Sequence, residues 1–255
     1  MSQKKTDAIL FIHGYNVTFN EAIETSVKIG RGLQRVNGNK GVNVVCFSWP
    51  SDGSMSPWIA YSNDRQDAAA SGPAFARGLL KMADFFRNMS PDEACHQKLH
   101  LMAHSMGNYV LRHALQEVRR QNGGRIPRIF DQILLFAPDE DDDAFEYEHK
   151  LKLLPRLGRH VNVYFNRGDA AMAISDVTKG NPDRLGDDGP RAPFQVPGKV
   201  SQIDCSNVVG GAVEHSYFVD DDKVIKDIAQ VLDGVDPKRV SNREYLDDRN
   251  RFVIG

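Results

Sequence analysis

The chain has few cysteines and no long apolar run, which argues against a disulfide-rich secreted protein and against a membrane protein. Its three cysteines, Cys46, Cys95 and Cys205, are far apart and lack the spacing of a disulfide framework or a metal-binding motif. The apolar run nearest the N-terminus, Ala8–Ile12, is too short for the hydrophobic region of a signal peptide or for a membrane span. We therefore expect a soluble, cytoplasmic protein with no metal site and no membrane insertion.

The chain also lacks an excess of either charge, with 32 lysines and arginines against 34 aspartates and glutamates. Partners such as nucleic acids and anionic membranes usually leave a basic bias, so we expect a small-molecule partner and no nucleic acid. The hydrophobic content of 41% over 255 residues is ample for one domain. We expect a single domain over residues 1–255, with its core at about 8–234 and a charged, weakly patterned extension at 235–255.

Six short runs of β-branched and large apolar residues recur along the chain. They are Ala8–Ile12, Val42–Trp49, Leu99–Ala103, Gln132–Ala137, Val161–Phe165 and Val200–Asp204. Most lack polar alternation, which is typical of strands covered on both faces, and helical patterns or polar loops separate them. The sequence therefore predicts an α/β fold with about six mostly parallel strands and helices on both faces.

Turn and cap residues predict where the helices and long loops lie. Asn20 is placed to cap a helix from Glu21 to about Val36, and Pro73 suits the first turn of another. A last helix is expected to start near Asp221. Segments 49–64 and 179–199 are predicted to be long irregular loops, which in compact domains are often functional.

The segment Ala103-His104-Ser105-Met106-Gly107 joins one predicted strand to an amphipathic helical stretch. Small residues on both sides of a serine at a strand–turn–helix junction are typical of a nucleophile elbow, which exposes the hydroxyl beside the free amides of a helix N-terminus. A serine that only caps the helix would explain a polar residue here, but not Ala103 and Gly107. Ser105 is therefore the predicted nucleophile.

A serine nucleophile needs a base and an acid that orients the base. His215 is the one histidine beyond the last predicted strand, where loops at strand ends converge, although a lone loop histidine is often an ordinary surface residue. Two carboxylates compete for the role of acid. Asp169 follows the strand at Val161–Phe165, and Asp139 begins an acidic run that could instead start a helix or hold a cation. We favour Asp169, because an isolated carboxylate orients an imidazole without crowding by like charges.

The oxyanion formed in acyl transfer needs two N–H donors. One is expected from Met106, directly after the nucleophile, and the other from Tyr15 in the loop after the first strand. In that loop Gly14 allows close approach, and His13 is expected to have a structural hydrogen-bonding role.

Aromatic residues beside the strand ends are candidates for the walls of a substrate pocket, although aromatics mostly pack in cores. The substrate-binding candidates are Tyr15, Trp49, Trp58 and Tyr61. Either Arg184 or Arg191 is expected to meet an anionic group of the substrate.

Taken together, these segments resemble the α/β-hydrolase superfamily, and in particular a bacterial branch described as a domain of unknown function. The resemblance extends from Ala8 to about Gly234 and rests on the segments at 13–16, 47–51, 103–107, 137–139 and 214–218. It implies a sheet with the second run outermost beside the first, followed by the third to the sixth, and a triad of Ser105, Asp169 and His215 without a metal or organic cofactor. Ala103 departs from the first glycine of G-x-S-x-G.

The resemblance also indicates what this chain lacks. The two strands that begin larger members are missing, and the stretch between Pro138 and His160 is too short for a cap domain. The expected function is a serine hydrolase that cleaves a small or short-acyl carboxylic ester. Alternatives are a thioesterase, amidase, acyltransferase or perhydrolase with the same triad, or a non-catalytic ligand-binding module.

Overall fold

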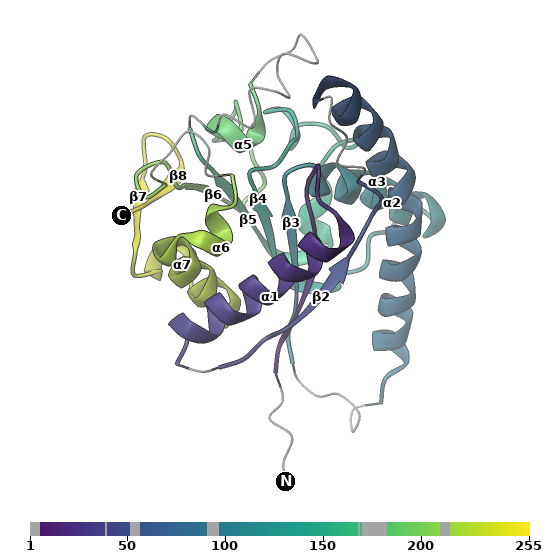
Figure 1. The fold of residues 1–255 in the computed structure, drawn as a ribbon, viewed down its shortest axis with the longest axis horizontal. Helices are drawn as coiled ribbons and strands as arrows, with labels where there is room; N and C mark the ends of the chain where they lie inside the picture. Colours follow the sequence, from purple (N-terminus) through teal and green to yellow (C-terminus); the bar gives the residue numbers. More distant parts are fainter. Residues whose placement is uncertain are drawn as a thin grey trace.

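The computed structural model describes residues 6–38, 40–51, 57–90, 97–167, 169, 183–209 and 215–255, with only the backbone of 57–60. Its centre is an eight-stranded sheet in the order β2-β1-β3-β4-β5-β6-β8-β7, in which every neighbouring pair is parallel except β7 and β8 (Figure 1). The strands are β1 Ala8–Ile12, β2 Asn43–Phe47, β3 Leu99–His104, β4 Phe130–Phe136, β5 Gly158–Phe165, β6 Val200–Asp204, β7 Arg243–Leu246 and β8 Arg251–Ile254.

Helices cover both faces of this sheet. The helices are α1 Phe19–Val36, α2 Pro57–Asn88, α3 Gly107–Gln121, α5 Leu185–Asp188, α6 Tyr217–Asp220 and α7 Asp222–Asp233, with short 3₁₀ turns at η1 Leu154–Arg156 and η2 Pro237–Arg239. One core lies between the sheet and α2 and α3, and a second lies between the sheet and α1, α6 and α7 (Figure 1). Within the described residues, no helix is long and apolar enough to cross a membrane.

The strand predictions are confirmed for all six apolar runs, including their order in the sheet. The structure adds β7 and β8, which come from the extension at 235–255 and form an antiparallel hairpin beside β6. These strands have four residues each, and charged side chains occupy several of their positions. Such short strands carry too little apolar pattern to be recognised from sequence.

The start of helix α1 was predicted wrongly. The helix begins at Phe19, because Thr18 and not Asn20 is its N-cap. The Thr18 side chain accepts a hydrogen bond from the Glu21 N–H, and the Glu21 carboxylate accepts one from the Thr18 N–H. The predicted start of the last helix is confirmed, since the Asp221 side chain caps α7.

Pro73 lies inside the 32-residue helix α2 and not in a first turn. The predicted loop at 49–64 is therefore helical from Pro57 onward. A proline inside a helix loses a backbone hydrogen bond and costs about 3 kcal/mol. Here Gly72 lets α2 approach α3 closely, because a Cβ on Gly72 would lie 2.5 Å from the His113 Cβ. The burial of α2 against α3 offsets the cost, and it fixes this helix beside the carboxyl ends of the strands.

Candidate active site

Ser105 occupies a sharp turn between β3 and α3, with a φ of 50° that lies in the left-handed region. A non-glycine residue in this region is strained, and such strain persists only where surrounding contacts fix it. The Ser105 N–H donates to the Phe136 carbonyl at 3.0 Å, and the Ser105 carbonyl accepts from the Asp139 N–H at 3.2 Å. The Asn108 side chain donates to the carbonyls of Ala103 and Ser105. The turn is thus held by the end of β4 and by the first turn of α3.

Two glycines allow the chain to pack tightly around this turn. A Cβ on Gly107 would lie 2.5 Å from the His13 carbonyl oxygen, so the start of α3 presses directly on the end of β1. A Cβ on Gly14 would lie 2.9 Å from the Ser105 Cβ, which places the loop after β1 against the serine. In the described part of the chain, the Met106 N–H has no hydrogen-bond acceptor. This arrangement leaves a donor beside Ser105 for a ligand oxygen.

His13 has the structural surroundings expected for it. Its Nδ1 lies 3.0 Å from the Gly14 carbonyl, and its Nε2 accepts from the Trp49 N–H at 3.1 Å, which fits the tautomer protonated at Nδ1. The Trp49 indole stacks on the imidazole and donates to the His13 carbonyl at 2.8 Å. Burial lowers the pKa of His13, so the ring is neutral and holds the loop after β1 in place.

Asp169 and His215 come together although they are 46 residues apart. The His215 Nδ1–H donates to Asp169 Oδ2 at 2.7 Å; the Asp169 side chain is fully buried, whereas 20% of the His215 side chain is exposed. A buried carboxylate that accepts from Nδ1 orients an imidazole and leaves its Nε2 as a base. Within the described residues no hydrogen bond joins the Ser105 hydroxyl to His215. In unliganded sites such bonds are often long and tighten only when substrate binds.

His104 connects the elbow to His215, and sequence reasoning missed this role. Its Nε2 lies 3.0 Å from the His215 carbonyl oxygen, and the centroids of the two imidazole rings are 4.6 Å apart. Burial lowers the pKa of His104 well below its usual value, with the neighbouring His215 as a second cause, so the ring stays neutral. Its signal in the sequence was its place directly before Ser105.

Tyr217 anchors the segment that carries His215, and it too was missed. Its hydroxyl donates to the Tyr164 carbonyl at 2.9 Å and accepts from the Ala137 N–H at 3.0 Å. Ala137 itself has a φ of 39°, so a second strained residue lies at the end of β4. The ends of β4 and β5 are thereby joined to the start of α6.

Asp139, the alternative acid, has other partners. The Tyr61 hydroxyl donates to its carboxylate at 2.7 Å, and the guanidinium groups of Arg65 and Arg184 each lie 3.9 Å from it. These contacts tie the acidic run to α2 and to the segment before α5. The geometry therefore favours Asp169 over Asp139 as the partner of His215.

The rest of the acidic run is held by cations of the protein. Arg184 pairs with Asp141 at 2.8 Å, and Arg112 pairs with the buried Glu140 at 3.1 Å. Burial raises the pKa of Glu140 to about 7, against the opposing effect of Arg112. Among the described residues, no group of three or more potential ligands is placed to hold a metal ion.

The predicted pocket walls have mixed surroundings. Trp49 and Tyr61 are both buried, whereas Tyr15 is half-buried and meets the Tyr61 ring edge-on with 5.7 Å between centroids. The side chain of Trp58 lies outside the described residues. These four remain candidates for substrate contact.

The two arginines predicted to meet an anionic substrate group have protein partners instead. Arg184 is fully buried in its ion pairs, and Arg191 pairs with Glu146 at 2.7 Å on the surface. The buried Arg184 forms a salt bridge with Asp141, so its guanidinium holds the segment before α5 against the acidic run.

A parallel sheet in this order, with a serine at a strained turn between β3 and α3, defines the α/β-hydrolase fold. Residues 1–233 match the family model described as "Alpha/beta hydrolase of unknown function (DUF900)", and the chain belongs to this family. The match ends just before the segment that forms β7 and β8.

The chain is also similar to "Uncharacterized protein alr1448" from Nostoc sp. (strain PCC 7120), with 26% identity over 219 residues, or 67% of this chain and 54% of that protein. It thus spans about half the length of this curated relative. Among solved structures, an inhibited esterase B from Lactobacillus rhamnosis shares 11% identity at a TM-score of 0.47, covering 91% of this chain and 78% of the other. An esterase from Pyrobaculum calidifontis shares 14% at 0.45, covering 92% and 78%.

Proposed function

We propose that this protein is a serine hydrolase that cleaves a small carboxylic ester through an acyl-enzyme. The observation that carries the proposal is the strained Ser105, held at a strand–helix turn beside the unengaged Met106 N–H. The hydrogen bond between Asp169 and His215, next to this turn through His104, supports the assignment of acid and base.

The mechanism follows from these positions. His215 Nε2 removes the proton from the Ser105 hydroxyl as its oxygen attacks the ester carbonyl carbon, and Asp169 stabilises the imidazolium that forms. The N–H groups of Met106 and Tyr15 bind the oxyanion. When the tetrahedral intermediate collapses, His215 returns the proton to the leaving alcohol.

Water then hydrolyses the acyl-enzyme, with water as the nucleophile and the Ser105 oxygen as the leaving group. His215 takes a proton from water, whose oxygen attacks the acyl carbon, and the Ser105 oxygen leaves with the proton that His215 returns. The absence of a long insertion between Pro138 and His160 favours short acyl groups, since no cap domain encloses a long chain.

The test is active-site labelling combined with a panel of chromogenic esters of increasing acyl length. We expect a fluorophosphonate to form one adduct on Ser105, and Ser105→Ala to lower kcat by about 10⁶-fold. The matched control is Ser26→Ala, which removes another buried serine, on α1. Its hydroxyl donates to the Ala22 carbonyl and also bonds the Cys46 thiol, away from the proposed site, and this variant should keep its activity.

Two results would contradict the proposal. A folded protein without an adduct on Ser105 would favour a ligand-binding module on a hydrolase fold. Faster turnover of thioesters, amides or added alcohol and peroxide acceptors than of esters would retain Ser105 as nucleophile and change the reaction to that of a thioesterase, amidase, acyltransferase or perhydrolase.

A further inference from the structure

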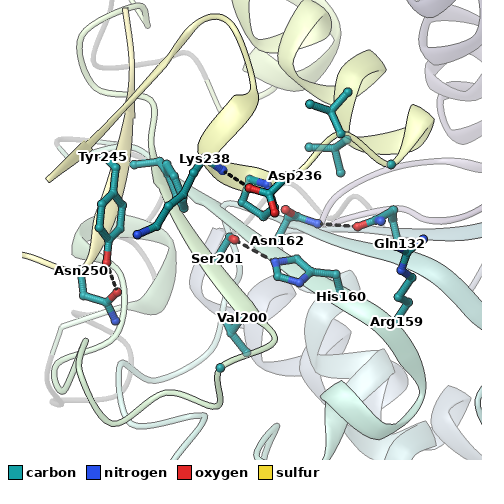
Figure 2. Close-up of a pocket in the computed structure, with 16 residues that line it drawn as sticks. Gln132, Arg159, His160, Asn162, Val200, Ser201, Asp236, Lys238, Tyr245 and Asn250 are labelled. Carbon is teal, nitrogen blue, oxygen red and sulfur yellow. Dashed lines mark hydrogen bonds between the residues drawn. The ribbon is translucent and has the colours of Figure 1, made fainter. Parts of the chain in front are cut away.

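A cavity of about 500 Å³ opens at the edge of the sheet opposite Ser105. Figure 2 shows the residues that line it. Its floor is formed near the amino ends of β4, β5 and β6, by residues such as Gln132, His160 and Ser201. Ser105 and Asp169 follow the carboxyl ends of β3 and β5, whereas the cavity lies at the amino ends. At the rise per residue of an extended strand, the length of β5 places about 15 Å between the cavity and the proposed ester site. The cavity is therefore separate from the proposed ester site.

The segment beyond the family match forms the other half of this cavity. Residues 234–238 and the hairpin of β7 and β8 contribute Tyr245, Asn250 and Phe252 to its lining. The match to the family ends at residue 233. The cavity is thus lined both by residues inside the family match and by residues that follow it.

The floor is polar, whereas the next residues along the same strands on this face, such as Leu134 and Ile203, are apolar. Gln132, Asn162 and Ser201 are all buried, and the Asn162 side-chain amide donates to the side-chain Oε1 of Gln132 at 3.2 Å. The His160 Nε2 lies 2.8 Å from the Ser201 hydroxyl, as Figure 2 shows. A hairpin that only covered the sheet would pack best on apolar residues, because buried polar groups need partners. Side-chain amides and a hydroxyl suit the edge of a flat heterocycle, as they do in base recognition.

The floor carries no charge of its own. Burial, together with Arg243 and Arg159, lowers the pKa of His160 to about 4, so its imidazole is neutral near pH 7. It can donate and accept hydrogen bonds to a neutral ring.

The walls add an aromatic surface. Tyr245 and Phe252 lie with ring centroids 4.9 Å apart, and the Tyr245 hydroxyl donates to the Asn250 side chain at 2.8 Å. The Lys238 ammonium lies 4.4 Å from the centroid of the Tyr245 ring, and this exposed cation can yield the ring to a base. Aromatic rings stack on bases with little dependence on their identity. A cavity of this volume is within the range that accommodates small organic ligands.

The rim is exposed and carries an excess of positive charge. Arg159 and Lys238 are exposed lining residues on two sides of the cavity (Figure 2), with the Asp236 carboxylate as the one acidic group among the lining residues. Arg159 also lies 3.4 Å from Asp131, but an exposed pair of this kind is weak and can yield to a bound anion. Guanidinium and ammonium groups bind phosphate oxygens, and a carboxylate can accept hydrogen bonds from sugar hydroxyls.

We propose that this cavity binds a small molecule with the chemistry of a nucleoside monophosphate. The flat base lies on the amide floor beside the aromatic wall, the sugar hydroxyls face Asp236, and the phosphate lies between Arg159 and Lys238. An uncharged nucleoside would lose the rim contacts, and inorganic phosphate would lose those of the floor and wall.

The experiment is calorimetric titration of the full chain with AMP, UMP, adenosine and inorganic phosphate. We expect at least one nucleotide to bind with a Kd below about 1 mM, and at least tenfold more tightly than adenosine or phosphate alone. The double variant Arg159→Gln/Lys238→Gln should weaken nucleotide binding about tenfold. The double variant Arg125→Gln/Lys226→Gln, which removes two exposed cations away from the cavity, is the charge-matched control and should bind like the parent chain.

A second pair of variants identifies the site. Ser201→Ala should weaken binding of both AMP and adenosine, because it alters the floor. Ser105→Ala should bind the nucleotide unchanged, since it lies at the other edge of the sheet. Failure of both nucleotides to bind, equal weakening by the rim and control variants, or loss of binding in Ser105→Ala would each overturn the proposal.

Discussion

The two edges of the same sheet hold their polar residues in different ways. At the carboxyl edge, Ser105 and Ala137 are fixed in strained backbone conformations, and Gly14 and Gly107 pack too closely against the turn to carry a Cβ without a shift. At the amino edge, polar side chains of regular strands line an open cavity of about 500 Å³. Strain and tight packing fix reacting atoms within a few tenths of an ångström, whereas an open polar cavity provides room and contacts for a ligand. The comparison suggests chemistry at one edge and binding at the other.

After Ser105→Ala, the largest expected effect on activity tests the acid at the carboxyl edge. Asp169→Asn should lower kcat for ester cleavage by about 10⁴-fold, because an amide stabilises the wrong tautomer of His215. Asp139→Asn is the matched control, since this carboxylate bonds Tyr61, and it should change kcat less than tenfold. Steady-state kinetics on a chromogenic ester measures both. The reverse order of effects would make Asp139 the acid.

A smaller effect should come from filling the space at the elbow. Gly107→Ala brings a Cβ to within 2.5 Å of the His13 carbonyl, so the backbone must shift, and we expect a loss of about 3 kcal/mol in unfolding free energy together with most of the activity. Gly78→Ala on α2 is the control, because its new Cβ meets nothing within 4 Å, and it should be neutral or stabilising. Equal stability of both variants in urea denaturation would show that the elbow is not tightly packed.

The pH dependence of the free energy of unfolding should depend partly on a buried histidine at the amino edge of the sheet. His100, fully buried at the start of β3, has its pKa lowered to about 4 by burial. Between this pH and 6.5 the unfolded chain binds the extra proton, so stability is complete above about pH 6.5 and falls as the pH drops. We expect His100 to contribute a loss of about 2 kcal/mol between pH 7 and pH 5, in addition to the losses from other buried histidines such as His160.

His100→Leu should remove that loss, and denaturant titrations at the two pH values measure it. His149→Leu, at an exposed position, is the control and should leave the pH dependence unchanged. An unaltered acid sensitivity in His100→Leu would mean that this imidazole is already charged when folded.

The smallest expected effect compares two tyrosine hydroxyls. Tyr217→Phe removes two buried hydrogen bonds, while the Ala137 N–H keeps its bond to the Tyr164 carbonyl, so we expect a loss of about 2 kcal/mol. Tyr245→Phe at the other edge removes one half-buried bond to Asn250 and should cost less than about 1 kcal/mol. Similar stability losses for the two variants in thermal unfolding would contradict the idea that the carboxyl edge is the more rigid one.

The strained turn at Ser105 and the strand order could be predicted because local chemistry specifies them. Small residues around Ser105 permit a turn that few other sequences tolerate, and uninterrupted apolar runs form strands covered on both faces. The start of α1 was misplaced by two residues because Thr18 and Asn20 are both good caps, and only the reciprocal bond with Glu21 decides between them. The helix at Pro57–Asn88 was hidden by Pro73, whose local penalty is outweighed by packing against α3.

By itself, the sequence determined the α/β class, the elbow at Ser105 and the short list of partners for it, because these depend on residue type and spacing along the chain. Only the tertiary structure decided that Asp169 and not Asp139 bonds His215, that His104 and Tyr217 support this pair, and that the last 20 or so residues enclose a second cavity. The physical reason is that hydrogen bonds and enclosed volumes join residues far apart in the chain, and no local pattern encodes which of several equivalent carboxylates or strand ends will meet.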